Sequence, residues 1–192
     1  MEIEFDEPTH EYKINGKKVP SVTQVLSLAN EFSNINKTIL QKAAKFGTAV
    51  HKATELYDQN NLNIETLDTA LIVYLDAWKK FLSETNFKVE KIEYRVGSNL
   101  GYAGTIDRVG ILNKKLTLLD IKSGTTVPKT ACLQTAAYAS AYNQHHNNRP
   151  IEQRICVQLK PLRYSIIPYN NITDYSMFCN FLSVYKWSHN YA

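Results

Sequence analysis

The sequence is poor in cysteine. Its 192 residues contain three cysteines, which lie far apart and form neither a CxxC motif nor a pair with a histidine: Cys132, Cys156 and Cys179. This spacing argues against a zinc knuckle and a disulfide scaffold, and no iron–sulfur cluster is expected. We expect these cysteines to behave as small buried hydrophobic residues.

Long apolar runs are also missing. The longest apolar stretches are a few residues, far short of the ~20 that a helix needs to span a bilayer. The start of the chain, MEIEFDEPTH, is acidic and has no apolar segment typical of a secretory signal. The sequence therefore predicts a cytoplasmic protein with no membrane partner.

Proline and glycine are scarce, with six and seven residues, and no linker, repeat or low-complexity tract divides the chain. Hydrophobic residues make up 44% and charged residues 21%, which excludes wholesale disorder. The net charge of +4 permits a polyanionic partner without requiring one. We expect a single domain over residues 1–192, with an N-terminal hairpin and helices in 1–85, a sheet core in 86–168 and a C-terminal helix in 170–192.

Local signals divide the chain into helices and strands. Asn15-Gly16 is typical of a type I′ hairpin turn, and Ser21 and Gln24 have the spacing of a capping box. Apolar periodicity predicts helices at 36–57, 64–83, 130–145 and 174–187, and strands at 88–96, 102–112, 116–122, 154–160 and 164–168. The first three of these strands have short connections and form an antiparallel meander, and the helix after them crosses over to a parallel strand. The fold class is therefore α/β, with an αβββαβ order and a mixed sheet flanked by helices.

Two charges end an almost continuous apolar strand. The run Leu116–Gly124 implies burial on both faces of the sheet, yet it contains Asp120 and Lys122. A buried charge costs several kcal/mol unless it is paired or bound to a metal. Strand alternation places these two side chains on the same face.

The preceding strand carries a further carboxylate among apolar residues, Asp107. If Asn113-Lys114 is a two-residue turn, Asp107 lies directly opposite Asp120; a three-residue turn would make the pair diagonal. Facing carboxylates repel each other, and a divalent cation with oxygen ligands, Mg²⁺ or Mn²⁺, resolves the conflict. The alternative is a plain salt bridge from Asp107 to Arg108 or Lys122.

Two predicted helices carry polar pairs at one-turn spacing. His51 is followed by Glu55, and Gln134 by Tyr138. Gly47, four residues before His51, either ends a helix or permits a close approach to its backbone. A lone helical histidine can equally be a surface or core residue, and the small residues between Gln134 and Tyr138 also suit plain helix–sheet packing.

Together these residues form four ordered motifs: Gly47-x-x-x-His51, Gly104-x-x-Asp107, Asp120-x-Lys122 and Gln134-x-x-x-Tyr138. In this order they resemble the PD-(D/E)XK nuclease superfamily, and specifically its RecB-like branch. The segment Pro20–Leu26, which follows a His-x-Tyr hairpin, resembles phage-type exonucleases and the mitochondrial genome maintenance exonuclease. The resemblance spans residues 8–160 and implies a restriction-endonuclease-like core.

The resemblance also implies roles for single residues. His51, Asp107 and Asp120, with the carbonyl of Ile121, would hold one or two Mg²⁺ or Mn²⁺ ions. Lys122 would position or help deprotonate the attacking water, so Asp107, Asp120 and Lys122 are the expected catalytic residues.

Three further residues have implied positions in this scheme. Gln134 and Tyr138 would support the site and contact the nucleic-acid strand. Glu93 falls where many members carry an acidic residue, and its role stays open. Cluster-bearing members have four cysteines that this chain lacks, in keeping with the expected absence of an iron–sulfur cluster.

The expected function is a metal-dependent DNA exonuclease that prefers single strands or DNA ends, in the cytoplasm of a bacterial or phage-infected cell. A structure-specific endonuclease, a non-catalytic nucleic-acid-binding or assembly subunit, and an enzyme acting on another phosphate ester are the alternatives. Expected partners are DNA and, on separate chains, a helicase, an annealing protein or a recombination partner, with a role in DNA repair or recombination.

Basic and aromatic residues are candidates for DNA contact. The cations near the expected site are Lys42, Lys45, Lys52, Arg95, Arg108 and Lys129. Three tyrosines are placed to stack on unpaired bases, namely Tyr102, Tyr138 and Tyr142. The alternatives are a solvated surface for most of the cations and core packing for most of the tyrosines.

Overall fold

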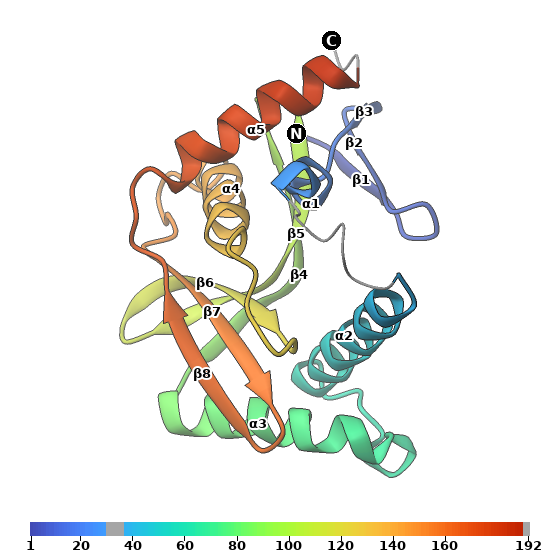
Figure 1. Ribbon diagram of the computed structural model, residues 1–192. Helices are drawn as coiled ribbons and strands as arrows, with labels where there is room; N and C mark the ends of the chain where they lie inside the picture. Colours follow the sequence, from blue (N-terminus) through green and yellow to red (C-terminus); the bar gives the residue numbers. More distant parts are fainter. Residues whose placement is uncertain (30–36, 190–192) are drawn as a thin grey trace.

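A computed structural model describes residues 1–29 and 37–189. The chain forms a three-stranded sheet and a five-stranded sheet (Figure 1). The first contains β1 (Ile3–Asp6), β2 (Glu11–Ile14) and β3 (Lys17–Val19). The second contains β4 (Lys88–Ser98), β5 (Tyr102–Leu112), β6 (Lys115–Lys122), β7 (Gln153–Lys160) and β8 (Arg163–Pro168). The α-helices are α1 (Val22–Leu26), α2 (Lys37–Asp58), α3 (Thr69–Thr85), α4 (Ala131–Asn143) and α5 (Asp174–Ser188).

The five-stranded sheet is mixed, which confirms the predicted α/β class. Strands lie in the order β4-β5-β6-β7-β8, and β6 pairs with β7 in parallel while the other pairs are antiparallel. The parallel pair follows from the long connection through α4, because only a crossover returns the chain to the same edge in the same direction.

The turn between β5 and β6 has two residues, as predicted. Asn113 and Lys114 have φ values of +51° and +66°, the two positive angles of a type I′ turn. This turn pairs Leu112 with Lys115, and the ladder runs from there to Arg108 opposite Leu119. The pairing therefore stops one residue before the expected pair of aspartates.

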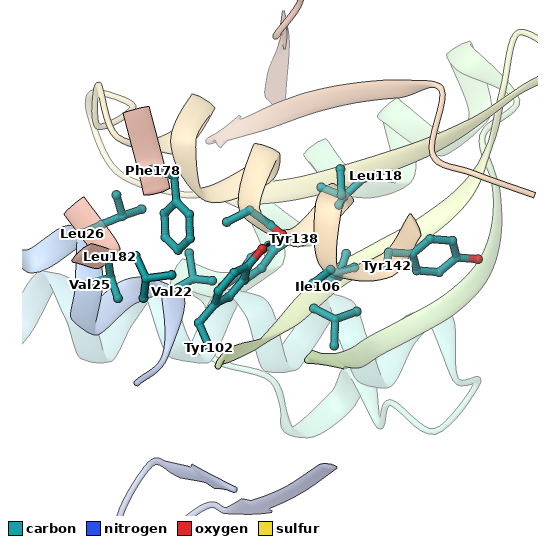
Figure 2. Close-up of a cluster of buried hydrophobic side chains, with 14 of the residues drawn as sticks. Val22, Val25, Leu26, Tyr102, Ile106, Leu118, Tyr138, Tyr142, Phe178 and Leu182 are labelled. Atoms are coloured by element: carbon teal, nitrogen blue, oxygen red, sulfur yellow. Dashed lines mark hydrogen bonds between the residues drawn. The ribbon is translucent and has the colours of Figure 1, made fainter. Parts of the chain in front are cut away.

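Helices cover both faces of this sheet, and side chains alternate between the two layers along β6. Leu116 and Leu118 lie in a core with α1, α4 and α5 (Figure 2). Leu119 and Ile121 lie in a second core with α2 and α3. Asp120 and Lys122 share the parity of Leu118, so their side chains belong to the layer of α4.

The N-terminal hairpin and helix form as their local signals predict. Asn15 and Gly16 both have positive φ, and the side chain of Ser21 and that of Gln24 form a reciprocal capping box. The sheet also includes β1, which sequence periodicity did not predict. The hydroxyl groups of Tyr12 on β2 and Thr105 on β5 lie 2.8 Å apart, which joins the two sheets.

Several elements differ in detail from the expectation. Helix α2 runs through Gly47 without a break, and residues 64–66 form a separate 3₁₀ turn before α3. Of the three cysteines only Cys156 is buried, while Cys132 and Cys179 are partly exposed. Within the part of the chain that the structure describes, no helix is both long enough and apolar enough to cross a membrane.

Candidate functional site

A chain of hydrogen bonds joins the end of β6 to the first half of α4. Lys122 Nζ donates to Asp120 Oδ1 at 2.8 Å and to Gln134 Oε1 at 3.3 Å. Gln134 Nε2 in turn donates to the hydroxyl of Tyr138 at 3.3 Å. The structure thus brings together four residues that the sequence placed in two separate motifs.

Asp107 lies at the point where β5 and β6 cease to pair. Its Oδ2 accepts a hydrogen bond from the backbone N–H of Ile121 at 2.6 Å, so this carboxylate replaces a ladder bond. The same oxygen lies 3.6 Å from His51 Nδ1 on α2. Asp107, His51 and the backbone of Ile121 therefore meet at one end of the sheet.

Glu93 joins this group from β4. Its position in the β4–β5 register is opposite Asp107, but the strands pair at Ile92 with Arg108 and at Tyr94 with Ile106, on either side of it. Its backbone φ of +45° lies in the left-handed region, which costs a non-glycine residue about 1 kcal/mol or more. Strain of this kind inside a strand is often found at functional sites.

Three side chains are close enough to share one ion. A ligand atom from each of His51, Glu93 and Asp107 lies within 4.8 Å of the others. Among the described residues, this is the group whose imidazole and carboxylate ligands converge in this way. Glu93, whose role the sequence left open, is thus the third member of this group beside His51 and Asp107.

Asp120 has a buried carboxylate oxygen that the protein leaves unpaired among the described residues. Its side chain is 2% exposed, and Oδ2 is a buried oxygen with no hydrogen-bond partner among the described residues. Burial raises the pKa of this carboxyl, the cation of Lys122 lowers it, and Asp107 raises it again, with a net increase. An unpaired buried oxygen costs free energy that a bound cation would recover.

The other ionisable groups also have shifted pKa values. Burial, then the neighbouring Asp107, raise the pKa of Glu93 to about 8, although Arg108 opposes the shift. Burial lowers the pKa of Lys122, but Asp120 and Asp107 outweigh it, so the net shift is upward. Without a cation, the site therefore favours a protonated Glu93 and a charged Lys122.

Arg108 neither contacts phosphate nor forms the salt bridge to Asp107 that was the alternative to a metal site. Its side chain is 0% exposed, so it is not available for phosphate contact. It also does not pair with the carboxylate of Asp107: its guanidinium donates to Asp58 Oδ2 at 2.6 Å, to Glu93 Oε1 at 3.2 Å and to the backbone oxygen of Asp107 at 2.6 Å. The burial arises because α2 and α3 cover this face of β5.

The three tyrosines considered for base stacking are buried. Tyr102, Tyr138 and Tyr142 are 0%, 4% and 3% exposed, so the packing alternative holds for them. The basic candidates other than Arg108 are exposed: Lys42, Lys45, Lys52, Arg95 and Lys129.

The remaining residues of the two helical pairs fall outside the ligand group. Glu55, one turn beyond His51 on α2, accepts hydrogen bonds from Lys52 at 2.9 Å and from Gln59 at 3.3 Å. The charge of Glu55 still contributes to the raised pKa of Glu93, after burial and Asp107.

Comparisons with known proteins give distant likenesses. No family model and no curated protein matches the chain. The crystal structure of SSO0001 is 16% identical, with a TM-score of 0.40 over 62% of this chain and 58% of that one, so the match spans less than two thirds of that structure. An exonuclease candidate from Eubacterium rectale is 10% identical, with a TM-score of 0.45 over 88% of this chain and 72% of that one. Neither likeness assigns a function to this chain.

Proposed function

We propose that this chain is a metal-dependent nuclease of the PD-(D/E)XK type that hydrolyses phosphodiester bonds in DNA. The observation that carries the proposal is the convergence of His51, Glu93 and Asp107 beside the ion pair of Lys122 with the buried Asp120. Oxygen-rich ligand sets with one imidazole suit Mg²⁺ or Mn²⁺. The motifs that resemble RecB-like nucleases supply His51 and Asp107 of this group, and β4 supplies Glu93.

The formal charges of the site support a divalent cation. Its ionisable side chains include the cations Arg108 and Lys122 and four carboxylates, those of Asp58, Glu93, Asp107 and Asp120. With every carboxylate ionised, these side chains have a net charge of −2. One Mg²⁺ or Mn²⁺ would neutralise it. Burial, then repulsion from Asp107, raises the pKa of Glu93, and a bound ion would offset that repulsion.

The roles of the side chains follow from their contacts. A bound cation would neutralise charge on the phosphate and make a nearby water more acidic. His51, Glu93, Asp107 and Asp120 Oδ2 would hold it. Lys122 would hold a proton beside the reacting phosphate.

Gln134 has a positioning role in this proposal. Its Oε1 is the second acceptor of the Lys122 ammonium group, so it fixes the direction in which Lys122 points. Tyr138 supports Gln134 from one turn further along α4 and is too deeply buried to stack on a base.

The choice of DNA as substrate rests on the charges around the site. The sequence has no Asp or Glu at residues 32–54, which include His51, or at 121–151, which follow Asp120. Both segments carry exposed lysines, Lys42 and Lys45 on one and Lys129 on the other. Lysine-bearing segments without carboxylates next to a metal site suit a polyphosphate backbone.

The experiment is a cleavage assay on three substrates: end-labelled single-stranded DNA, end-labelled duplex and closed circular DNA. Each is incubated with Mg²⁺, Mn²⁺ or EDTA. We expect the wild type to degrade the linear substrates with either metal, and Asp120→Asn and Lys122→Met to be inactive. Lys115→Met, at the exposed opposite end of β6, is the matched control and should cleave like the wild type.

Two outcomes would change the proposal. If the wild type degrades no substrate with either metal, the chain is not a nuclease. If it cuts closed circles, it is an endonuclease, and the preference for ends is wrong.

A further inference from the structure

Arg108 is a buried cation shared between two carboxylates. Its Nε donates to Asp58 Oδ2 at 2.6 Å, whereas its Nη1 donates to Glu93 Oε1 at the longer distance of 3.2 Å. Its Nη2 donates to Thr54 Oγ1 at 3.3 Å. The guanidinium therefore spans from α2 to β4. Of its two bonds to carboxylates, the one to Asp58 is the shorter.

Asp58 is itself fixed at the end of α2. Its second oxygen accepts a hydrogen bond from Trp78 Nε1 at 2.9 Å, and its side chain is 3% exposed. Asp58 lies two turns after His51 on one face of α2. Helix α2 thus supplies one of the proposed ligands and also the carboxylate that compensates Arg108.

We propose that Asp58 is a positioning residue, which engages Arg108 so that the carboxylate of Glu93 stays available to a metal ion. This inference rests on the metal site proposed above. A cation buried at 0% exposure requires a carboxylate partner, because the desolvated charge is otherwise uncompensated. Asp58 is that partner, and it lies outside the ligand group. Glu93 then accepts a single N–H bond from Arg108.

Without the charge of Asp58, Glu93 is the remaining carboxylate in contact with Arg108 among the described residues. The guanidinium fork can then bind Glu93 with two parallel bonds, which are stronger than the present contact. A carboxylate held in this way is a poorer metal ligand. Outer residues of this kind change metal affinity by about 10- to 100-fold.

The test is the affinity of the folded protein for Mn²⁺, measured by isothermal titration calorimetry at a fixed pH in the absence of DNA. Asp58→Asn keeps the shape of the side chain and removes its charge, so we expect about tenfold weaker binding. The double variant Asp58→Asn with Arg108→Met removes the competing cation as well. It should regain most of the lost affinity, because Arg108 then no longer competes with the metal ion for the carboxylate of Glu93.

The double variant separates this inference from a general loss of structure. If Asp58 only held α2 against the sheet, removing Arg108 as well would weaken Mn²⁺ binding further. Asp174→Asn is the matched control, because Asp174 forms another largely buried arginine–aspartate pair, at 2.9 Å to Arg154, between β7 and α5. That variant should bind Mn²⁺ like the wild type.

Three results have defined meanings. Wild-type affinity in Asp58→Asn, or weaker binding in the double variant than in the single one, overturns the inference while the metal site stands. No Mn²⁺ binding by the wild type overturns the metal site itself and the inference with it. If Asp58→Asn does not fold, Trp78→Phe removes one of the two bonds that hold Asp58 and should weaken Mn²⁺ binding in the same direction by a smaller factor; unchanged binding there also overturns the inference.

Discussion

The ring of Tyr138 lies directly against the backbone of Gly104. A Cβ on Gly104 would lie 2.4 Å from Cε1 of Tyr138, well inside contact distance. Gly104 is therefore required by a close approach of α4 to β5. The same approach sets the position of the Tyr138 hydroxyl group, which accepts the hydrogen bond from Gln134.

Gly104→Ala should destabilise the protein by about 1–3 kcal/mol, because the buried ring of Tyr138 has no room to move away from the new methyl group. The free energy of unfolding in urea measures this effect. Activity should fall as well, since displacement of Tyr138 disturbs Gln134 and Lys122. A variant with wild-type stability would show that α4 can shift without cost.

Gly47→Ala should have the opposite effect on stability. Gly47 lies inside α2, and an added Cβ would lie 3.6 Å from Ser123 Oγ, which is an ordinary contact. Alanine should therefore raise the free energy of unfolding by about 0.5–1 kcal/mol through its higher helix propensity. Urea unfolding beside Gly104→Ala makes the comparison, and a loss of stability would indicate a tighter contact with the segment after β6.

Glu93 should make the stability of the metal-free protein depend on pH. Its pKa is about 8 in the folded protein, against an ordinary value of 4.5, so the folded state binds this proton more tightly than the unfolded state. The contribution of Glu93 to stability is then present at low pH and is lost as the pH rises from 4.5 towards 8. Glu93→Gln should remove this part of the slope and be more stable than the wild type at pH 8 in EDTA.

Urea unfolding of both proteins at several pH values, with EDTA throughout, measures that difference. Both proteins keep the pH dependence of stability that comes from Asp58 and Asp120, whose pKa values are also raised, mainly by burial. The difference between the two curves is therefore the quantity to compare. Parallel curves across this range would contradict the expected contribution of Glu93.

Lys42 and Lys45 should contribute to DNA affinity through phosphate contacts. Glutamate at either position should weaken binding of single-stranded DNA, and neutralisation of each contact should reduce the salt slope, log K against log salt, by about 0.7. Fluorescence anisotropy in Ca²⁺ at several salt concentrations measures both quantities. Lys115→Glu, at the far end of β6, is the control, and an equal effect there would mean that the protein has no preferred face for DNA.

The fold was predictable because its main elements depend on short segments. The Asn113-Lys114 turn fixes the β5–β6 register by itself, and the capping box at Ser21 fixes the start of α1. The pairing of Asp120 with Lys122 also follows from alternation within one strand. In each case the residues that determine the structure are neighbours in the sequence.

The parts that were missed depend on residues far apart in the chain. Arg108 has the sequence appearance of a surface cation, and its burial depends on partners far away in the chain, such as Asp58, 50 positions earlier. The left-handed backbone of Glu93 has no local cause such as glycine or asparagine. Strand β1 is short, and its pairing with β2 across a loop outweighs its weak periodicity.

The burial of β6 on both faces has a consequence for insertions and deletions. Leu116 and Leu118 occupy one layer and Leu119 and Ile121 the other, so a shift of the strand by one residue would change the buried apolar area little. The same shift would move Asp120 and Lys122 from the α4 layer to the α2–α3 layer. Hydrophobicity therefore does not protect the position of the charged pair, and the length of the turn at Asn113-Lys114 does. Among variants of this chain, a single added residue in that turn should harm the site more than most substitutions within β6.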